Sequence, residues 1–106
     1  MTAPEVVAYV PDLMDRSRLP AGVRFVDRPD DLAGWEADLV LVDLGRPGAL
    51  EAAARQPGRV IGFAAHVDDD LLARAAALGV EALPRSRFFR RVRAIVGGGD
   101  AGTVAR

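Results

Sequence analysis

The 106-residue chain contains no cysteine and no lysine, and it has few hydroxyl side chains. The absence of cysteine excludes disulfides, thiolate nucleophiles and cysteine-ligated metals, and it is compatible with a reducing cytoplasm, where we expect the protein. The absence of lysine means that all 14 basic residues are arginine, so no lysine ammonium is available to any site. Threonine occurs only as Thr2 and Thr103, and serine only as Ser17 and Ser86.

The remaining composition is that of an ordinary globular domain. Charged residues make up 27% of the chain, the net charge is -1 and half of the residues are hydrophobic, so the whole chain has no attraction to a polyanion. The first 15 residues contain only a short apolar run and no basic segment, which indicates neither a signal peptide nor a membrane span. We expect one domain over residues 1–96 and a flexible, glycine-rich tail over residues 97–106.

Five short apolar runs divide the chain. They are continuous rather than alternating, which is typical of strands covered on both faces in a parallel sheet. The runs occupy residues 6–10, 23–26, 39–42, 60–65 and 80–83.

Helical patterns lie between these runs, at residues 13–19, 48–56, 69–79 and 87–96. In the third of these segments, Asp68 is a candidate N-cap, and four residues form one apolar face: Leu71, Leu72, Ala75 and Leu78. The connection over residues 27–37 has room for only one or two turns, because Gly34 interrupts it.

Strands that alternate with helices predict an α/β fold with right-handed crossovers. We expect a flavodoxin-like, doubly wound parallel sheet of five strands in the order 2-1-3-4-5, with shortened second and third helices. In this topology the working groups lie beyond the carboxyl ends of the strands, near the point where the strand order reverses. Asp12 and Asp43 each follow a predicted strand, so we expect both carboxylates at that edge.

Three segments together resemble the CheY-like receiver domain of bacterial response regulators. The segment "ADLVLVDLGRPG" is similar to that family's third strand, where the phospho-accepting aspartate is followed four residues later by proline, as Asp43 is by Pro47. "RVIGFAAH" resembles the fourth strand and "ALGVEALPRSRFF" the fifth, so the similarity spans residues 5–96. The resemblance implies a role in two-component signal transduction, with Asp43 as phosphoacceptor and Mg²⁺ held by acidic residues.

The chain departs from the family at the residues that perform this chemistry. The family's acidic pair corresponds to Pro11 and Asp12, so Asp12 and Asp43 remain as candidate cation ligands and we expect at most weak Mg²⁺ binding. The hydroxyl position corresponds to Ala64, and the lysine position corresponds to Arg85. A planar guanidinium does not replace a compact ammonium at a packed phosphoryl site. These changes favour a pseudo-receiver: a signalling or protein-interaction domain that has no enzymatic activity and lacks the full aspartyl-phosphate switch.

Two alternatives remain open. The first is a degenerate receiver that is still phosphorylated on Asp43. The second is a small hydrolase or ligand-binding Rossmann-like domain that uses Asp43, His66 and Ser86 on one rim. The chain has no G-x-S-x-G nucleophile elbow, which argues against the hydrolase.

The segment "RSRFFRRVR" concentrates arginine near the end of the predicted domain. We interpret it as a face that binds a protein partner of unknown identity rather than nucleic acid, because the whole chain is not basic. A homodimer could form through residues 69–79, the fifth strand and the last helix, with the acids of residues 68–70 and Glu81 opposite the arginines. The candidate interface residues are Leu83, Arg87, Arg90, Arg91 and Arg93.

Overall fold

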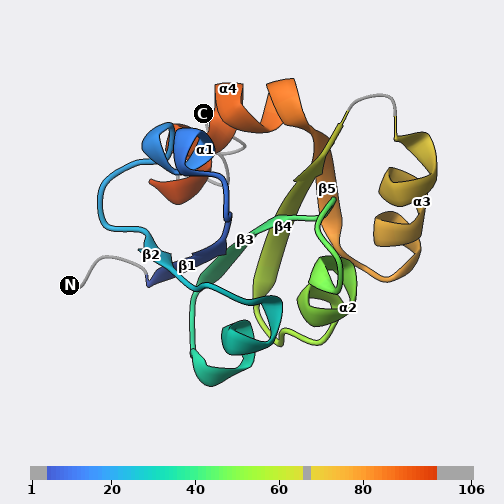
Figure 1. The fold of residues 1–106 in the computed structure, drawn as a ribbon, viewed down its shortest axis with the longest axis horizontal. Helices are drawn as coiled ribbons and strands as arrows, with labels where there is room; N and C mark the ends of the chain where they lie inside the picture. The colour runs from blue at the N-terminus through green and yellow to red at the C-terminus, as the bar shows by residue number, and fades with distance from the viewer. Residues whose placement is uncertain (1–4, 66–67, 98–106) are drawn as a thin grey trace, which may run out of the picture.

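The computed structural model describes residues 5–65 and 68–97. Its strands form one parallel sheet in the order β2-β1-β3-β4-β5, which confirms the predicted α/β architecture and strand order (Figure 1). The elements, in chain order, are β1 (Val6–Tyr9), α1 (Leu13–Ser17), β2 (Arg24–Phe25), η1 (Pro29–Gly34), β3 (Leu39–Asp43), α2 (Ala49–Ala54), β4 (Arg59–Ala64), α3 (Asp69–Ala77), β5 (Glu81–Pro84) and α4 (Arg85–Val96).

The parallel register brings the carboxyl ends of the strands to one edge of the sheet. Val6 of β1 lies opposite Leu39 of β3, and Leu39 lies opposite Arg59 of β4. Ile61 of β4 pairs with Glu81 of the edge strand β5. Residues that follow β1, β3, β4 and β5 therefore begin from the same side of the molecule.

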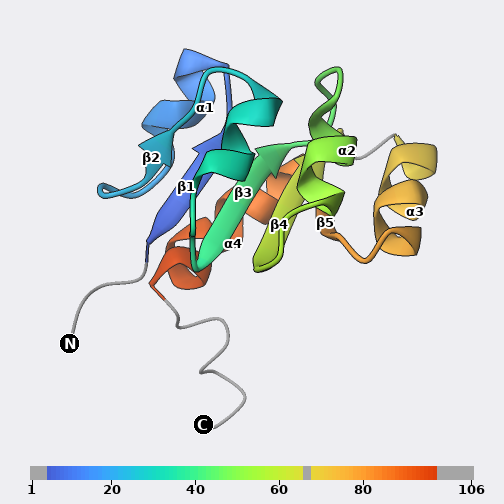
Figure 2. The same ribbon diagram turned by 90° about the horizontal axis from the view of Figure 1, so that it is seen from below.

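Helices cover both faces of the sheet, as the continuous apolar runs predict. One core cluster joins the strands to α4 and the end of α1, through Phe88, Val92 and Leu19. The other joins them to η1 and α2, through Leu32 and Leu50. Figure 2 shows α2 in front of the strands and α4 behind them. Each strand thus buries side chains on both faces.

Local signals start and end the helices. Asp12 caps α1 by accepting the N–H of Asp15 at 3.1 Å, and Asp68 caps α3 by accepting the N–H of Leu71 at 3.2 Å. Gly48 precedes α2 with a positive φ of 76°, a conformation that glycine adopts without steric cost. The predicted short second and third helices are η1, a 3₁₀ helix, and α2, each of six residues.

The predicted apolar face of the segment 69–79 is only partly buried. Ala75 is buried, Leu71 and Leu72 are half-buried, and Leu78 is 52% exposed. The helix ends at Ala77, so Leu78 is its C-cap and lies outside the last turn. The expectation that Leu78 packs inward is therefore wrong, because the helix ends one residue before it and leaves its side chain exposed.

The last helix begins at Arg85, two residues before the predicted start, with Pro84 as its N-cap residue. Its inward face contains Phe88, Val92 and Ile95, as expected. No helix in the described part of the chain has the length and apolar character needed to cross a membrane. The predicted tail lies outside the described residues, except for Gly97.

Candidate functional site

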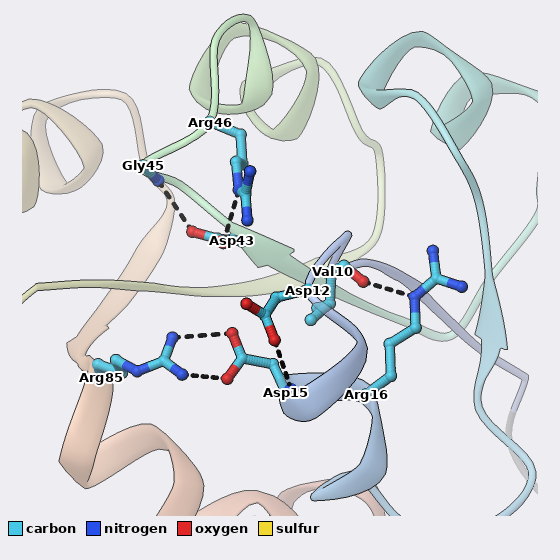
Figure 3. A network of polar contacts seen from close by, with 8 residues as sticks. All are labelled: Val10, Asp12, Asp15, Arg16, Asp43, Gly45, Arg46 and Arg85. Atoms are coloured by element: carbon cyan, nitrogen blue, oxygen red, sulfur yellow. Dashed lines mark hydrogen bonds and ion pairs between the residues drawn. The ribbon is translucent and has the colours of Figure 1, made fainter.

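The carboxyl edge of the sheet brings together three of the predicted site residues. Asp12 follows β1, Asp43 is the last residue of β3, and Arg85 directly follows β5 (Figure 3). Asp12 and Asp43 are close enough for their charges to act on Arg85. A fourth charged residue, Asp15 of α1, lies in the same cluster.

Asp43 is held by the loop that follows it. One carboxylate oxygen accepts the N–H of Gly45 at 3.2 Å, and the other accepts the Nε–H of Arg46 at 3.3 Å. The Asp43 side chain is only 13% exposed. A bond from an aspartate to the backbone N–H two residues later is the ordinary means by which this residue type stabilises a turn. The geometry therefore gives Asp43 a structural role in turning the chain from β3 towards α2.

Asp12 also has a structural partner, because it is the N-cap of α1. Its Oδ1 atom accepts the N–H of Asp15, and its residue is exposed. Arg16 of the same helix donates its Nε–H to the carbonyl of Val10 at 2.7 Å, which ties the helix to the end of β1. These bonds fix the βα turn.

The strongest polar contact at this edge joins Asp15 to Arg85. Arg85 donates from Nη1 to Oδ2 at 2.9 Å and from Nη2 to Oδ1, which is the parallel two-bond geometry of an arginine–carboxylate pair. The Asp15 side chain is 4% exposed, whereas that of Arg85 is 43% exposed. Within the described segments, Asp15 is the buried charged residue. The pair joins α1 to the start of α4 across the carboxyl edge.

The guanidinium of Arg85 is the electrostatic centre of the site. Its pKa is raised above the ordinary value, first by the hydrogen bonds to Asp15 and further by the charges of Asp15, Asp43 and Asp12, against the opposing effect of burial. The same group lies 5.5 Å from the ring centre of Phe63 and 5.1 Å from that of Phe89. Arg85 thus supplies a permanent positive charge where acids converge.

Two other predicted residues lie near this edge without joining the network. Ala64 ends β4 and is 2% exposed, and its methyl group cannot donate a hydrogen bond. Ser86 is exposed in the first turn of α4. No bond joins Ser86 to Asp43 in the parts of the chain that are described. His66 lies outside the described residues, so the structure gives no position for it relative to Asp43 and Ser86.

The carboxylates present do not fit a divalent cation. Across residues 5–65 and 68–97, no three histidine, aspartate or glutamate side chains are grouped so as to hold a metal ion. Both oxygens of Asp15 bind Arg85, and both oxygens of Asp43 accept bonds from its own loop. A cation such as Mg²⁺ prefers several oxygen ligands, so these engaged groups would bind it poorly.

The predicted interface residues divide into two groups. Leu83 was expected in an exposed interface, but it is 9% exposed and belongs to the core cluster beneath α4. It faces inward because β5 is covered by α4 on that side. Arg87, Arg90 and Arg93 are exposed, and Arg91 is half-buried.

Sequence reasoning missed the role of Asp15. The sequence holds a weak signal, because the apolar Leu19 follows four positions later and so lies on the same side of the helix as Asp15; the structure shows that Leu19 is buried. A buried acid requires a cation, and Arg85 begins α4 at the same edge of the sheet.

A second feature was also missed: a cavity of about 390 Å³ beside the loop that Asp43 begins. It lies between the start of α2 and the start of α3. Its charged lining residues have both signs: Arg46, Glu51, Asp68, Asp70 and Arg74. Arg46 turns towards Asp43 and Arg74 towards Glu51, so the cavity offers no concentration of one charge.

Comparison of the chain with models of protein families, with curated proteins and with solved structures found no match.

Proposed function

We propose that this chain is a pseudo-receiver: a signalling or protein-interaction domain that is not switched by an aspartyl phosphate. The observation that carries the proposal is the Asp15–Arg85 pair at the edge where a receiver performs its chemistry. Arg85 occupies the position at which the family resemblance requires lysine. Its guanidinium is bound to a buried carboxylate and is not directed at an incoming phosphoryl group.

The physical requirements of phosphoryl transfer support this proposal. Transfer to a carboxylate depends on cations and hydrogen-bond donors that stabilise the charge of the phosphoryl oxygens. Ala64 supplies no donor, and Arg85 has two of its donors engaged by Asp15. Asp43, for its part, is bound on both oxygens. The domain would therefore act through its surface, as a binding partner, and we place it in the cytoplasm, where proteins of two-component signalling work.

The experiment is a phosphorylation assay read by intact mass. The protein is incubated with acetyl phosphate and Mg²⁺, alongside its Asp43→Asn variant and an active receiver domain as positive control. We expect no adduct on either form of this protein while the active receiver is modified. A labile single phosphate on the wild type that is absent from Asp43→Asn would refute the proposal and identify a functioning phosphoreceiver.

A further inference from the structure

The layer formed by α1 and α4 has a marked excess of positive charge. Residues 12–19 and 85–96 contain seven arginines and two aspartates: Arg16, Arg18, Arg85, Arg87, Arg90, Arg91 and Arg93 against Asp12 and Asp15. The chain as a whole has a net charge of -1, so the remaining surface is acidic in balance. Positive charge is therefore concentrated on the layer of α1 and α4.

Arginines of the opposite layer are neutralised by nearby acids, whereas three exposed arginines of α4 are not. On the opposite layer the ion pairs are Arg28–Asp31, Arg55–Asp30 and Arg74–Glu51. Among the residues that the structure describes, no carboxylate pairs with Arg87, Arg90 or Arg93. These three guanidinium groups are exposed and remain available to an anionic partner.

Two large aliphatic side chains are exposed on the same layer. Leu13 and Met14, at the start of α1, are 75% and 77% exposed. Met14 precedes Arg18 by one helical turn, which places the two on the same side of α1. The guanidinium of Arg18 lies 4.1 Å over the ring of Phe89 in α4, so this side of α1 borders α4. Met14 is thus next to the arginine-rich helix, and Leu13 directly precedes it in the same turn of α1.

The chemistry of this surface favours an acidic protein over a nucleic acid. Single-stranded nucleic acids are bound by aromatic side chains that stack on bases. Here Phe88 is buried, and Phe89 is covered by Arg18 and Arg85. The exposed apolar groups, Leu13 and Met14, are aliphatic. They match the apolar side of a protein helix.

A second copy of the chain is less well matched. A symmetric contact through α4 would place the unpaired arginines of one copy against those of the other, which is repulsive. Leu83, the apolar residue expected at such an interface, is buried within one copy. Glu81 is also engaged, with Arg59 at 3.5 Å.

We infer that this basic face binds an acidic amphipathic helix of another protein. The face consists of Leu13, Met14, Arg18, Arg87, Arg90 and Arg93. The inference rests on the proposed function as an interaction domain and names the chemistry of its partner. α4 has 12 residues and is about 18 Å long, so a partner helix of about three turns would span it. Carboxylates on that helix meet the arginines, and its aliphatic side chains cover Leu13 and Met14.

Methionine methyl NMR tests this directly, because the chain has only two methionines, of which Met14 lies in the face. Protein labelled with ¹³C at the methionine methyl groups is titrated with a synthetic amphipathic helix of glutamate, leucine and alanine. Two control peptides are a scrambled sequence of the same composition and a version with lysine in place of glutamate. We expect the acidic amphipathic peptide to shift the Met14 methyl and the α4 amides, with weaker binding of both controls.

Variants separate the two parts of the face. The double variant Arg90→Glu, Arg93→Glu should bind the acidic peptide about tenfold or more weakly than wild type, since two attractive charge contacts become repulsive. The double variant Leu13→Ser, Met14→Ser should bind the peptide about tenfold more weakly, because less apolar surface is buried on binding. The matched control is Arg55→Glu combined with Arg74→Glu on the opposite layer, which should leave affinity within about twofold. The exposed positions of these side chains allow all the variants to fold, which melting temperatures would verify.

Four results would overturn the inference. The first is an unmoved Met14 methyl at millimolar peptide, and the second is equal binding of the scrambled peptide. The third is tighter binding of a thymidine oligonucleotide or of anionic phosphatidylglycerol vesicles than of the peptide. The fourth is a dimer by light scattering that Arg90→Glu with Arg93→Glu dissociates, which would assign the face to a second copy. If the acidic peptide does not bind and the phosphorylation assay also finds no phosphate on Asp43, the inference about this face fails while the proposed function is not contradicted.

Discussion

Replacing Arg85 by methionine tests whether the Asp15–Arg85 pair holds the carboxyl edge together. Methionine keeps most of the apolar stem beside Phe63 and Phe89 but removes the charge. The carboxylate of Asp15, which is 4% exposed, then has no cation to neutralise it. Burial of an unpaired charge is one of the few changes that destabilise a small domain severely.

The expected loss follows from the exposure of the two partners. Removing one partner of a fully buried ion pair costs about 3–5 kcal/mol. The Arg85 side chain is 43% exposed, so water screens part of the interaction, and we expect a loss of about 2–3 kcal/mol. For a domain of this size, each kcal/mol lowers the melting temperature by about 4–8 °C. A fall of about 10–20 °C should therefore be visible by circular dichroism.

The sharper test compares the two single variants with the double variant. Asp15→Asn leaves a guanidinium that water can still reach, so it should cost only about 1 kcal/mol. Combining it with Arg85→Met removes the buried charge altogether and should recover more than half of the loss caused by Arg85→Met alone. Urea unfolding at pH 7 measures all three free energies.

The control variant is Arg55→Met, which breaks a surface pair whose side chains are 63% and 85% exposed. It should change the free energy of unfolding by less than about 0.5 kcal/mol. The reasoning would be refuted if Arg85→Met cost no more than this control. Equal losses for Asp15→Asn and Arg85→Met would likewise show that the difference in burial is not what determines the cost.

Two further predictions concern pH and packing. Because the pKa of Arg85 is raised, the stability that its charge contributes is fully present below the ordinary pKa of arginine and is lost only when the pH rises through the raised pKa. In an Arg85→Lys variant the side chain begins to lose its proton at about pH 10.4, so the variant should lose stability relative to wild type above that pH. Melting temperatures measured between pH 7 and 11 would show this difference. Gly62→Ala would place a Cβ atom 2.5 Å from Leu44 Cγ, so the variant should lose about 1–3 kcal/mol of unfolding free energy, measured in urea. Adding Leu44→Ala should restore part of this loss. An unchanged free energy of unfolding would contradict the close packing of β4 against the Leu44 side chain.

The fold could be predicted because its signals are local and repeated. Continuous apolar runs identified all five strands to within about two residues, and their alternation with helices restricts the topology. Helix ends were less predictable, since they depend on tertiary packing. Leu78 matches the apolar period of α3, yet the helix ends before it and leaves it exposed.

The candidate site was only partly predictable. Topology alone brings Asp12, Asp43 and Arg85 to one edge, because each lies at or just after the end of a parallel strand. Topology alone does not give the partner of Arg85, since the pair depends on which way Asp15 of a five-residue helix turns, and Leu19 one turn later is a weak indication of that direction. Residues 70 positions apart become neighbours through the packing of α1 beside α4, and no motif in the chain records that contact.

Because the chain has no lysine, position 85 holds an arginine, and this determines how the side chain interacts with Asp15. A lysine at position 85 could approach a phosphoryl group on Asp43 as a compact point charge, but the longer, planar arginine needs a flat, two-oxygen partner. Asp15 supplies that partner from a buried position, and the rings of Phe63 and Phe89 hold the guanidinium nearby. An arginine bound in this way cannot swing towards Asp43 without leaving a buried carboxylate unpaired. The cost of that movement is the physical reason behind the proposal that this edge does not act as a phosphorylation switch.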